Sequence, residues 1–112
     1  MILTNIESVP GKKIVKLCGM VSGSTVRAKH AISDIGASIK NFFGGELVDY
    51  TTLIEESRKE ATQRMIMQAI ALKANAVVNV RYATSAVTTG AAEVYAYGTA
   101  VRVEDITPQQ GA

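Results

Sequence analysis

The chain has few of the residues that build disulfide frameworks, aromatic cores or metal cages. Its 112 residues include one cysteine, one histidine, two prolines and no tryptophan, and aromatic side chains make up 5%. The single thiol, Cys18, excludes an internal disulfide, so nothing in the sequence requires an oxidising compartment. No apolar run reaches the length of a membrane span, and the first residues do not resemble a signal peptide. We therefore predict a cytoplasmic protein with no membrane partner.

Charge is also nearly balanced. Twelve basic residues against ten acidic ones leave a net charge of +2, which is too small to predict binding to nucleic acid. A hydrophobic content of 47% and this length predict one globular domain. We place that domain at residues 1–106 and expect residues 107–112 to form a flexible C-terminal tail.

Alternating apolar residues predict two strands at each end of the chain. The first pair is expected at Ile2–Ile6 and Lys13–Val21, with the Ser-Gly-Ser-Thr run that follows ending the pattern. The second pair is expected at Ala76–Thr84 and Glu93–Val103, separated by a loop of small residues at 85–92. The residues expected on one face of the second strand are Val15, Leu17 and Val21.

Two helices are expected between the strand pairs. An apolar stripe over Ile32–Phe43 predicts the first helix, and Gly44 and Gly45 are expected to end it. A second, longer helix is expected to begin near Tyr50 and to stop at Asn75, a residue that tolerates the left-handed conformation. The resulting order, ββααββ, predicts an α+β domain.

The second helix changes character halfway along. Its first half has an ordinary polar face, on which Glu60 and Arg64 form a favourable pair one turn apart. In its second half Ile66, Met67 and Ile70 fall on that same face, so the helix becomes apolar nearly all round. Monomers rarely leave such a patch bare, so we predict a homo-oligomer with these three residues at its interface. The alternative is that the last strands, with their small residues, curl over the patch; those residues are Ala96, Gly98 and Ala100.

Three segments resemble a known family. Gly23–Lys29 (GSTVRAK), Gly44–Glu46 and Glu93–Val101 (EVYAYGTAV) are similar to the YbjQ family of small bacterial and archaeal proteins, and the similarity extends from about Ile2 to Glu104. The resemblance implies a dodecin-like subunit assembled into a pentameric ring. It also implies the family's description as heavy-metal-binding, and it supplies no catalytic residues.

The sequence offers few soft ligands for a metal ion, since it has one cysteine and one histidine. This sequence has Lys73 and Asn79 where the family usually has glycine, and Cys18 where an aliphatic residue is common. A closed site for a soft metal needs about four converging ligands, so Cys18 is expected to be a small buried hydrophobic residue. Repetition of His30 around a ring axis could still hold an ion jointly. Cys18 and His30 are thus the weak metal candidates, and the alternative for His30 is a turn cap or a solvent-exposed side chain.

A second candidate site precedes the first expected helix. Hydroxyls, cations and free backbone N–H groups before a helix are what an anion site needs. The candidate residues are Ser24, Thr25, Arg27, Lys29 and His30. The alternative is that these charges face water or pair with acidic residues such as Glu46 or Asp49 across a subunit interface.

We therefore interpret the chain as a non-enzymatic homo-oligomeric ring that binds a small ligand, with a metal ion as one option, at a site made by several subunits. The main alternative is a structural or protein-interaction ring with no ligand. A hydrolase that uses Ser24 and His30 is a third hypothesis, but no carboxylate is evidently placed to orient the imidazole of His30.

Overall fold

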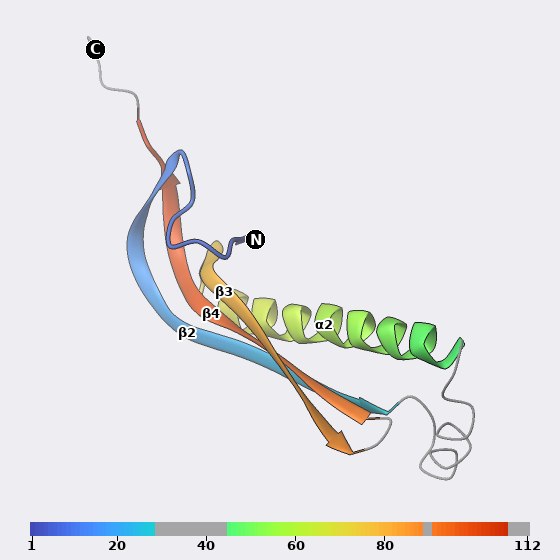
Figure 1. The fold of residues 1–112 in the computed structure, drawn as a ribbon. Coiled ribbons are helices and arrows are strands. Elements are labelled where there is room, and N and C mark those ends of the chain that lie inside the picture. Colours follow the sequence, from blue (N-terminus) through green and yellow to red (C-terminus); the bar gives the residue numbers. More distant parts are fainter. Residues whose placement is uncertain (29–44, 89–90, 108–112) are drawn as a thin grey trace.

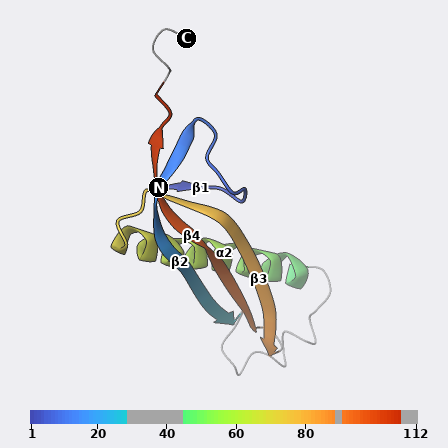
Figure 2. The ribbon, with the colours of Figure 1, turned by 90° about the vertical axis from the view of Figure 1, so that its left-hand side faces the viewer.

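The structure is a computed structural model that describes residues 1–28, 45–88 and 91–107. These residues form a helix packed on a four-stranded sheet (Figure 1). The strands lie in the order β1-β3-β4-β2; β1 is parallel to β3 and the other neighbours are antiparallel (Figure 2). None of the helical residues described here forms a helix long and apolar enough to cross a membrane. The elements are β1 (Ile2–Leu3), β2 (Lys12–Ala28), α2 (Gly45–Ala71), β3 (Ala76–Thr88) and β4 (Ala91–Asp105).

The α+β class is confirmed, but the predicted order ββααββ is wrong. The described residues contain one helix between the strand pairs, and the helix predicted over Ile32–Phe43 lies outside them. Gly45 is the first residue of α2 rather than a stop for an earlier helix. Glycine is accepted at both ends of helices.

Strand β2 is longer and more irregular than the alternation predicted. It continues through Ser22 and Ser24, which pair with Tyr97 and Tyr95 of β4. Irregularities in the pairing, between Ile14 and Lys16 and again between Leu17 and Gly19, shift the alternation of its faces. Val21 is consequently buried while Leu17, predicted on the same face, is 70% exposed. The bend of β2 in Figure 1 lies in this part of the strand.

The loop predicted at residues 85–92 is largely strand. β3 continues to Thr88 and β4 begins at Ala91, with Ala86 opposite Ala92. Alanine is a poor strand former by propensity, but Ser85, Ala86 and Thr88 are each paired with a residue of β4. Pairing therefore overrides the local preference.

The helix ends at Ala71, and the left-handed residue that stops it is Lys73, not Asn75. Lys73 has a left-handed φ of 64°. Its N–H donates to the carbonyl of Ile70 at 2.9 Å, and the N–H of Ala74 donates to the carbonyl of Ala69 at 3.0 Å. This is the Schellman arrangement that usually has glycine at the left-handed position. The side chain of Asn75 instead bonds to both backbone groups of Val103, at 2.8 and 2.9 Å.

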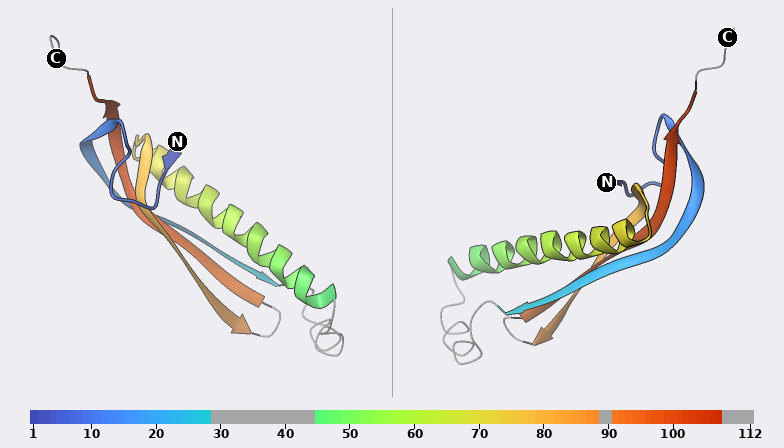
Figure 3. Two further views of the ribbon diagram at one scale, coloured as in Figure 1. Left: turned by 45° about the horizontal axis from the view of Figure 1, so that its top comes forward. Right: turned by 180° about the vertical axis from the view of Figure 1, so that it is seen from behind.

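The helix packs against one face of the sheet, mainly over β2 and β4 (Figure 3). Closest approach occurs at Gly23, where a Cβ would lie 2.3 Å from the carbonyl oxygen of Ala61 and 2.5 Å from the backbone nitrogen of Met65. The small residues Ala96 and Ala100 belong to the same buried cluster, so the predicted small-residue stripe serves this chain's own helix. The buried members of this cluster are Val21, Ala61, Met65, Ala69, Ala74, Val77, Val80, Val94, Ala96 and Ala100.

A second buried cluster contains Val9 and residues at one end of the sheet. The N–H groups of Ile2 and Thr4 donate to the carbonyls of Asn75 and Val77, which holds the N-terminal segment beside β3. The buried residues there are Val9, Ala76, Val78, Val101 and Val103. Farther along β4, Tyr95 and Tyr97 remain exposed.

Candidate functional site

Arg27, the part of the basic segment that the structure describes, is paired with acidic residues of its own chain. The guanidinium of Arg27 donates to Glu60 Oε2 through Nε at 3.1 Å and to Glu56 Oε2 through Nη1 at 3.0 Å, and its Nη2 also contacts Glu60. The hydroxyl of Thr25 donates to Glu60 Oε1 at 3.3 Å. Arg64 pairs with Glu60 from one turn along the helix, as the sequence predicted. Together these hydrogen bonds and ion pairs hold β2 against α2.

The electrostatics of this cluster follow from those contacts. The hydrogen bond from Arg27, helped by the nearby charge of Arg64, lowers the pKa of the Glu60 carboxyl although partial desolvation opposes it. The hydrogen bond to Glu60 in turn raises the pKa of Arg27. With its N–H groups engaged by two carboxylates, Arg27 is occupied by partners within the subunit.

The remaining residues of that segment do not converge with Arg27. Thr25 is buried on the face beneath the helix, whereas Ser24 precedes it in the strand and therefore points to the opposite face. Lys29 and His30 lie outside the described residues. The structure therefore brings Thr25 and Arg27 together with Glu56 and Glu60. The sequence did not identify these two glutamates as partners of Arg27.

Of the two metal candidates, Cys18 lies within the described residues and His30 lies outside them. Cys18 is partly rather than fully buried and packs against the helix-side cluster. Within the described ranges no three His, Cys, Asp or Glu side chains gather into a group that could hold an ion. The whole chain has one cysteine and one histidine. The described part of one subunit therefore shows no ligand set of a closed soft-metal site.

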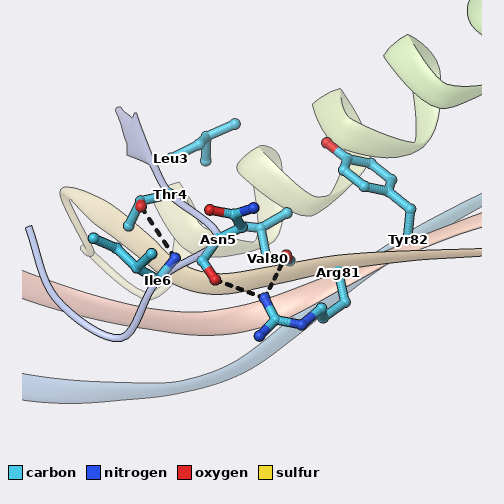
Figure 4. Close-up of a pocket in the computed structure, with 7 residues that line it drawn as sticks. All are labelled: Leu3, Thr4, Asn5, Ile6, Val80, Arg81 and Tyr82. Atoms are coloured by element: carbon cyan, nitrogen blue, oxygen red, sulfur yellow. Dashed lines mark hydrogen bonds between the residues drawn. The ribbon is translucent and has the colours of Figure 1, made fainter.

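A pocket that the sequence did not predict lies where β1 ends beside β3 (Figure 4). It has a volume of about 610 Å³ and is open to solvent. Arg81 Nη1 donates to the carbonyls of Asn5 at 2.7 Å and Val80 at 3.0 Å, while Tyr82 points the other way and its hydroxyl lies 2.9 Å from that of Thr62. Arg81 and Tyr82 diverge because consecutive residues of a strand face opposite ways. The lining residues are Leu3, Thr4, Asn5, Ile6, Val80, Arg81 and Tyr82.

Exposed apolar side chains of the described residues include groups on two surfaces, one along α2 and one on the sheet. Along α2, Met67 is 67% exposed, Ile70 is 55% exposed and Ile66 is half-buried, and Leu72, which directly follows the helix, is also exposed. We call these four residues the helix strip. On the face of the sheet away from α2, Met20 is 84% exposed beside Tyr95 and Tyr97, whose ring centroids are 5.5 Å apart. We call this second surface, made by Met20, Val26, Tyr95 and Tyr97, the outer sheet face.

Comparisons with known proteins agree with the sequence motifs. A family model described as "Putative heavy-metal-binding" matches residues 1–104. A UPF0145 protein of Hahella chejuensis is 60% identical over 93% of this chain and 100% of its own length. UPF0145 proteins of Archaeoglobus fulgidus and Thermus thermophilus are 50% and 46% identical, covering 92% and 93% of this chain and 95% and 91% of their own.

One solved structure has a similar fold. It is the crystal structure of a DUF74-family protein of unknown function from Pediococcus pentosaceus, with a TM-score of 0.66 over 93% of this chain and 98% of that one. At 18% sequence identity, this similarity concerns the fold alone.

Proposed function

Since the chain belongs to the YbjQ family, we propose that it is a subunit of a homo-oligomeric ring, and that the ring binds a small ligand at a site made by more than one subunit. The exposed helix strip carries this proposal. Leaving Met67, Ile70 and Leu72 in water forgoes a stabilisation of roughly 25 cal/mol for each Å² of apolar surface that a partner would cover. Soluble monomers rarely keep contiguous apolar patches of this kind.

A ring is favoured over a two-fold dimer because the two bare surfaces differ. The helix strip lies on α2, whereas the outer sheet face lies on the side of the sheet that α2 does not cover. A contact between the helix strip of one subunit and the outer sheet face of the next joins unlike surfaces. Repetition of such a contact closes into a ring when the rotation between subunits permits it. The pentamer implied by the family resemblance is the stoichiometry that we propose.

The ligand site is assigned to the assembly because one subunit does not complete it. The pocket beside Arg81 is open to solvent, and the described residues lack a metal-binding group. A ring repeats every side chain around its axis. One metal-binding side chain per subunit can therefore give several that converge on the axis. The family description makes a heavy-metal ion the first ligand to test. The proposed role is binding rather than catalysis.

Substitution of Ile70 tests the assembly. Because Ile70 is 55% exposed in the subunit, Ile70→Asp should leave the subunit folded, but an unpaired carboxylate buried between subunits costs about 3 kcal/mol or more. We expect light scattering to report a ring for the wild type and a folded monomer for Ile70→Asp. Gln63→Asp, which places the same charge at an exposed polar position of α2, is the matched control and should remain assembled.

Metal analysis of the wild-type ring, purified without an affinity tag, tests the ligand. Stoichiometric metal that is lost in the Ile70→Asp monomer would support a site made by several subunits. A ring that forms but takes up no metal would exclude a heavy-metal ion and favour the alternative, a ring that presents a surface to protein partners.

A further inference from the structure

Arg81 borders the aromatic part of the outer sheet face. β3 pairs with β4 so that Arg81 lies opposite Tyr97, and directly opposed residues have their side chains on the same face of a sheet. In Figure 4 the guanidinium of Arg81 lies on the side of β3 away from α2, whereas Tyr82 points toward α2. On its other side Tyr97 is paired with Ser22 of β2. A charged side chain therefore stands beside a surface of aromatic rings and hydroxyl groups.

The guanidinium of Arg81 is held in place through one of its nitrogens. Nη1 donates to the carbonyls of Asn5 at 2.7 Å and Val80 at 3.0 Å. In the part of the chain that the structure describes, no hydrogen bond or ion pair engages Nε or Nη2. Arg27, by comparison, donates to two glutamates. The N–H groups of Nε and Nη2 form one edge of the guanidinium, and such an edge can bind both oxygens of a carboxylate.

A pocket of about 300 Å³ lies next to Tyr97 on the outer sheet face. Met20, which is 84% exposed, lines it together with Tyr95 and Tyr97, whose rings are 5.5 Å apart and inclined by 36°. The volume is at the lower end of the range of small-molecule sites, about 300–1,000 Å³. Tyrosine rings and the sulfur of methionine pack favourably against aromatic groups. The pocket therefore suits the ring of a small aromatic molecule.

We propose that the shared site of the ring-shaped assembly lies on the outer sheet face and binds a small aromatic carboxylate. This inference rests on the proposed function and names a ligand class for its site. The carboxylate accepts hydrogen bonds from Nε and Nη2 of Arg81, the aromatic body lies over Tyr97, and the helix strip of the next subunit covers it. Neighbouring strands are about 4.8 Å apart, so Arg81 and the pocket beside Tyr97 are within reach of one small molecule.

The charges on this face favour a ligand with a single negative charge. Arg81 supplies one positive charge beside Tyr97, and a monocarboxylate balances it. A phosphate dianion would bring a second negative charge, with no second cation among the residues that line the pocket. Glu93 of the same strand is four residues from Tyr97, which is about 13 Å along an extended chain. Its carboxylate therefore does not oppose an anion bound at Arg81.

Isothermal titration calorimetry of the full-length wild-type protein tests the ligand class, with benzoate as the probe. We expect benzoate to bind with a Kd of about 1 mM or tighter. Benzamide is a neutral molecule of the same shape, and acetate is a carboxylate without the ring. Each should bind at least roughly tenfold more weakly, because each lacks one of the two recognised groups. If benzamide, acetate or inorganic phosphate binds as tightly as benzoate, the proposed ligand class is wrong.

Substitution of Arg81 locates the binding. Arg81→Gln removes the charge and should weaken benzoate binding at least roughly tenfold, and Arg81→Lys, which keeps the charge but not the planar N–H edge, should weaken it about fivefold or more. Arg102→Gln is the matched control, because Arg102 also donates to a backbone carbonyl, that of Lys73 at 2.8 Å. Its affinity should equal that of the wild type.

Circular dichroism and light scattering establish that each variant is folded and assembled, and Arg81→Lys decides the test if Arg81→Gln does not fold. Undiminished benzoate binding by Arg81→Lys would overturn the assignment to Arg81. A loss in Arg102→Gln as large as the loss in the Arg81 variants would overturn it too, since binding would then follow net charge.

The Ile70→Asp monomer separates this inference from the proposed function. It retains Arg81 and both tyrosines but lacks the covering helix strip, so it should bind benzoate at least roughly tenfold more weakly than the ring. A ring that does not bind benzoate refutes the inference and leaves the assembly standing. A monomer that binds benzoate as tightly as the ring also refutes it, because the neighbouring subunit then contributes nothing. A wild type that is monomeric in light scattering refutes the proposed function, and the inference with it.

Discussion

Gly23 sets the distance between α2 and the sheet, so adding one methyl group there should have a large effect. In Gly23→Ala the new Cβ would lie 2.3 Å from the carbonyl oxygen of Ala61, 2.5 Å from the backbone nitrogen of Met65 and 2.8 Å from Arg64 Cβ. Close carbon–oxygen contacts in proteins are about 3.3 Å or longer. Since two of the opposing atoms belong to helix backbone, no rotamer change relieves the clash. The helix would have to move by roughly 1 Å.

The loss in the free energy of unfolding follows from the contacts between α2 and the sheet that this movement would weaken. Ala61, Met65 and Ala69 are fully buried between α2 and the sheet. A radial gap of about 0.5–1 Å already forfeits a quarter to a half of the dispersion energy of each contact. Inserted methyl groups in well-packed interiors typically cost about 1–3 kcal/mol. We expect Gly23→Ala to lie at the upper end, with a loss of about 3 kcal/mol in the free energy of unfolding.

Urea unfolding followed by circular dichroism measures this loss, in the Ile70→Asp background so that assembly does not contribute. Gly11→Ala is the control, because Gly11 has a left-handed φ of 80° but no atom lies within 4 Å of the position that a Cβ would take there. It should lose only the conformational cost of about 1 kcal/mol. If Gly23→Ala unfolds within about 0.5 kcal/mol of its parent, or costs no more than Gly11→Ala, the close packing of α2 on β2 is refuted.

Three further predictions concern single residues. Lys73→Gly should stabilise the protein by about 1 kcal/mol in thermal unfolding because it removes a left-handed lysine, while Asn79→Gly should gain less because asparagine tolerates that region; equal or absent gains would contradict this. The pKa of Glu60 is lowered in the folded state, so its contribution is present above about pH 4.3 and is lost as the pH falls through the folded value. Wild type should therefore lose more stability between about pH 5 and pH 3 than Glu60→Gln, and parallel acid curves would refute the pairing with Arg27. Gln68→Met should accelerate hydrogen exchange at the Ser22 amide because it removes the side-chain oxygen that accepts its hydrogen bond, whereas Gln68→Glu keeps an acceptor and should preserve the slow exchange. An unchanged rate in both variants would show that Gln68 does not protect this amide.

Features governed by local periodicity could be predicted from the sequence. The step of about 100° per residue places Met67 and Ile70 away from the stripe that contains Met65 and Ala69, and the structure exposes the first pair and buries the second. The pair of Glu60 and Arg64 follows from the same geometry. The α+β class follows from helical and strand periods in separate parts of the chain.

Features that depend on distant partners could not be predicted. The faces of β2 follow from irregularities in its pairing with β4, so Leu17 and Val21 separate even though simple alternation places them together. Arg27 meets Glu56 and Glu60, about thirty residues away, only because α2 packs over β2. Two adjacent glycines fit the start of a helix as well as its end, so local signals alone do not reveal that α2 begins at Gly45.

The central claim is that the functional unit is a ring whose ligand site needs several subunits. Native mass spectrometry of untagged protein tests it most directly, because one spectrum reports both the number of 11.9 kDa subunits and any ligand mass that remains bound. We predict a complex of five subunits with additional ligand mass, and an Ile70→Asp monomer without that mass. A wild-type protein that stays at 11.9 kDa at micromolar concentration, or a monomer that keeps the ligand, would contradict the account.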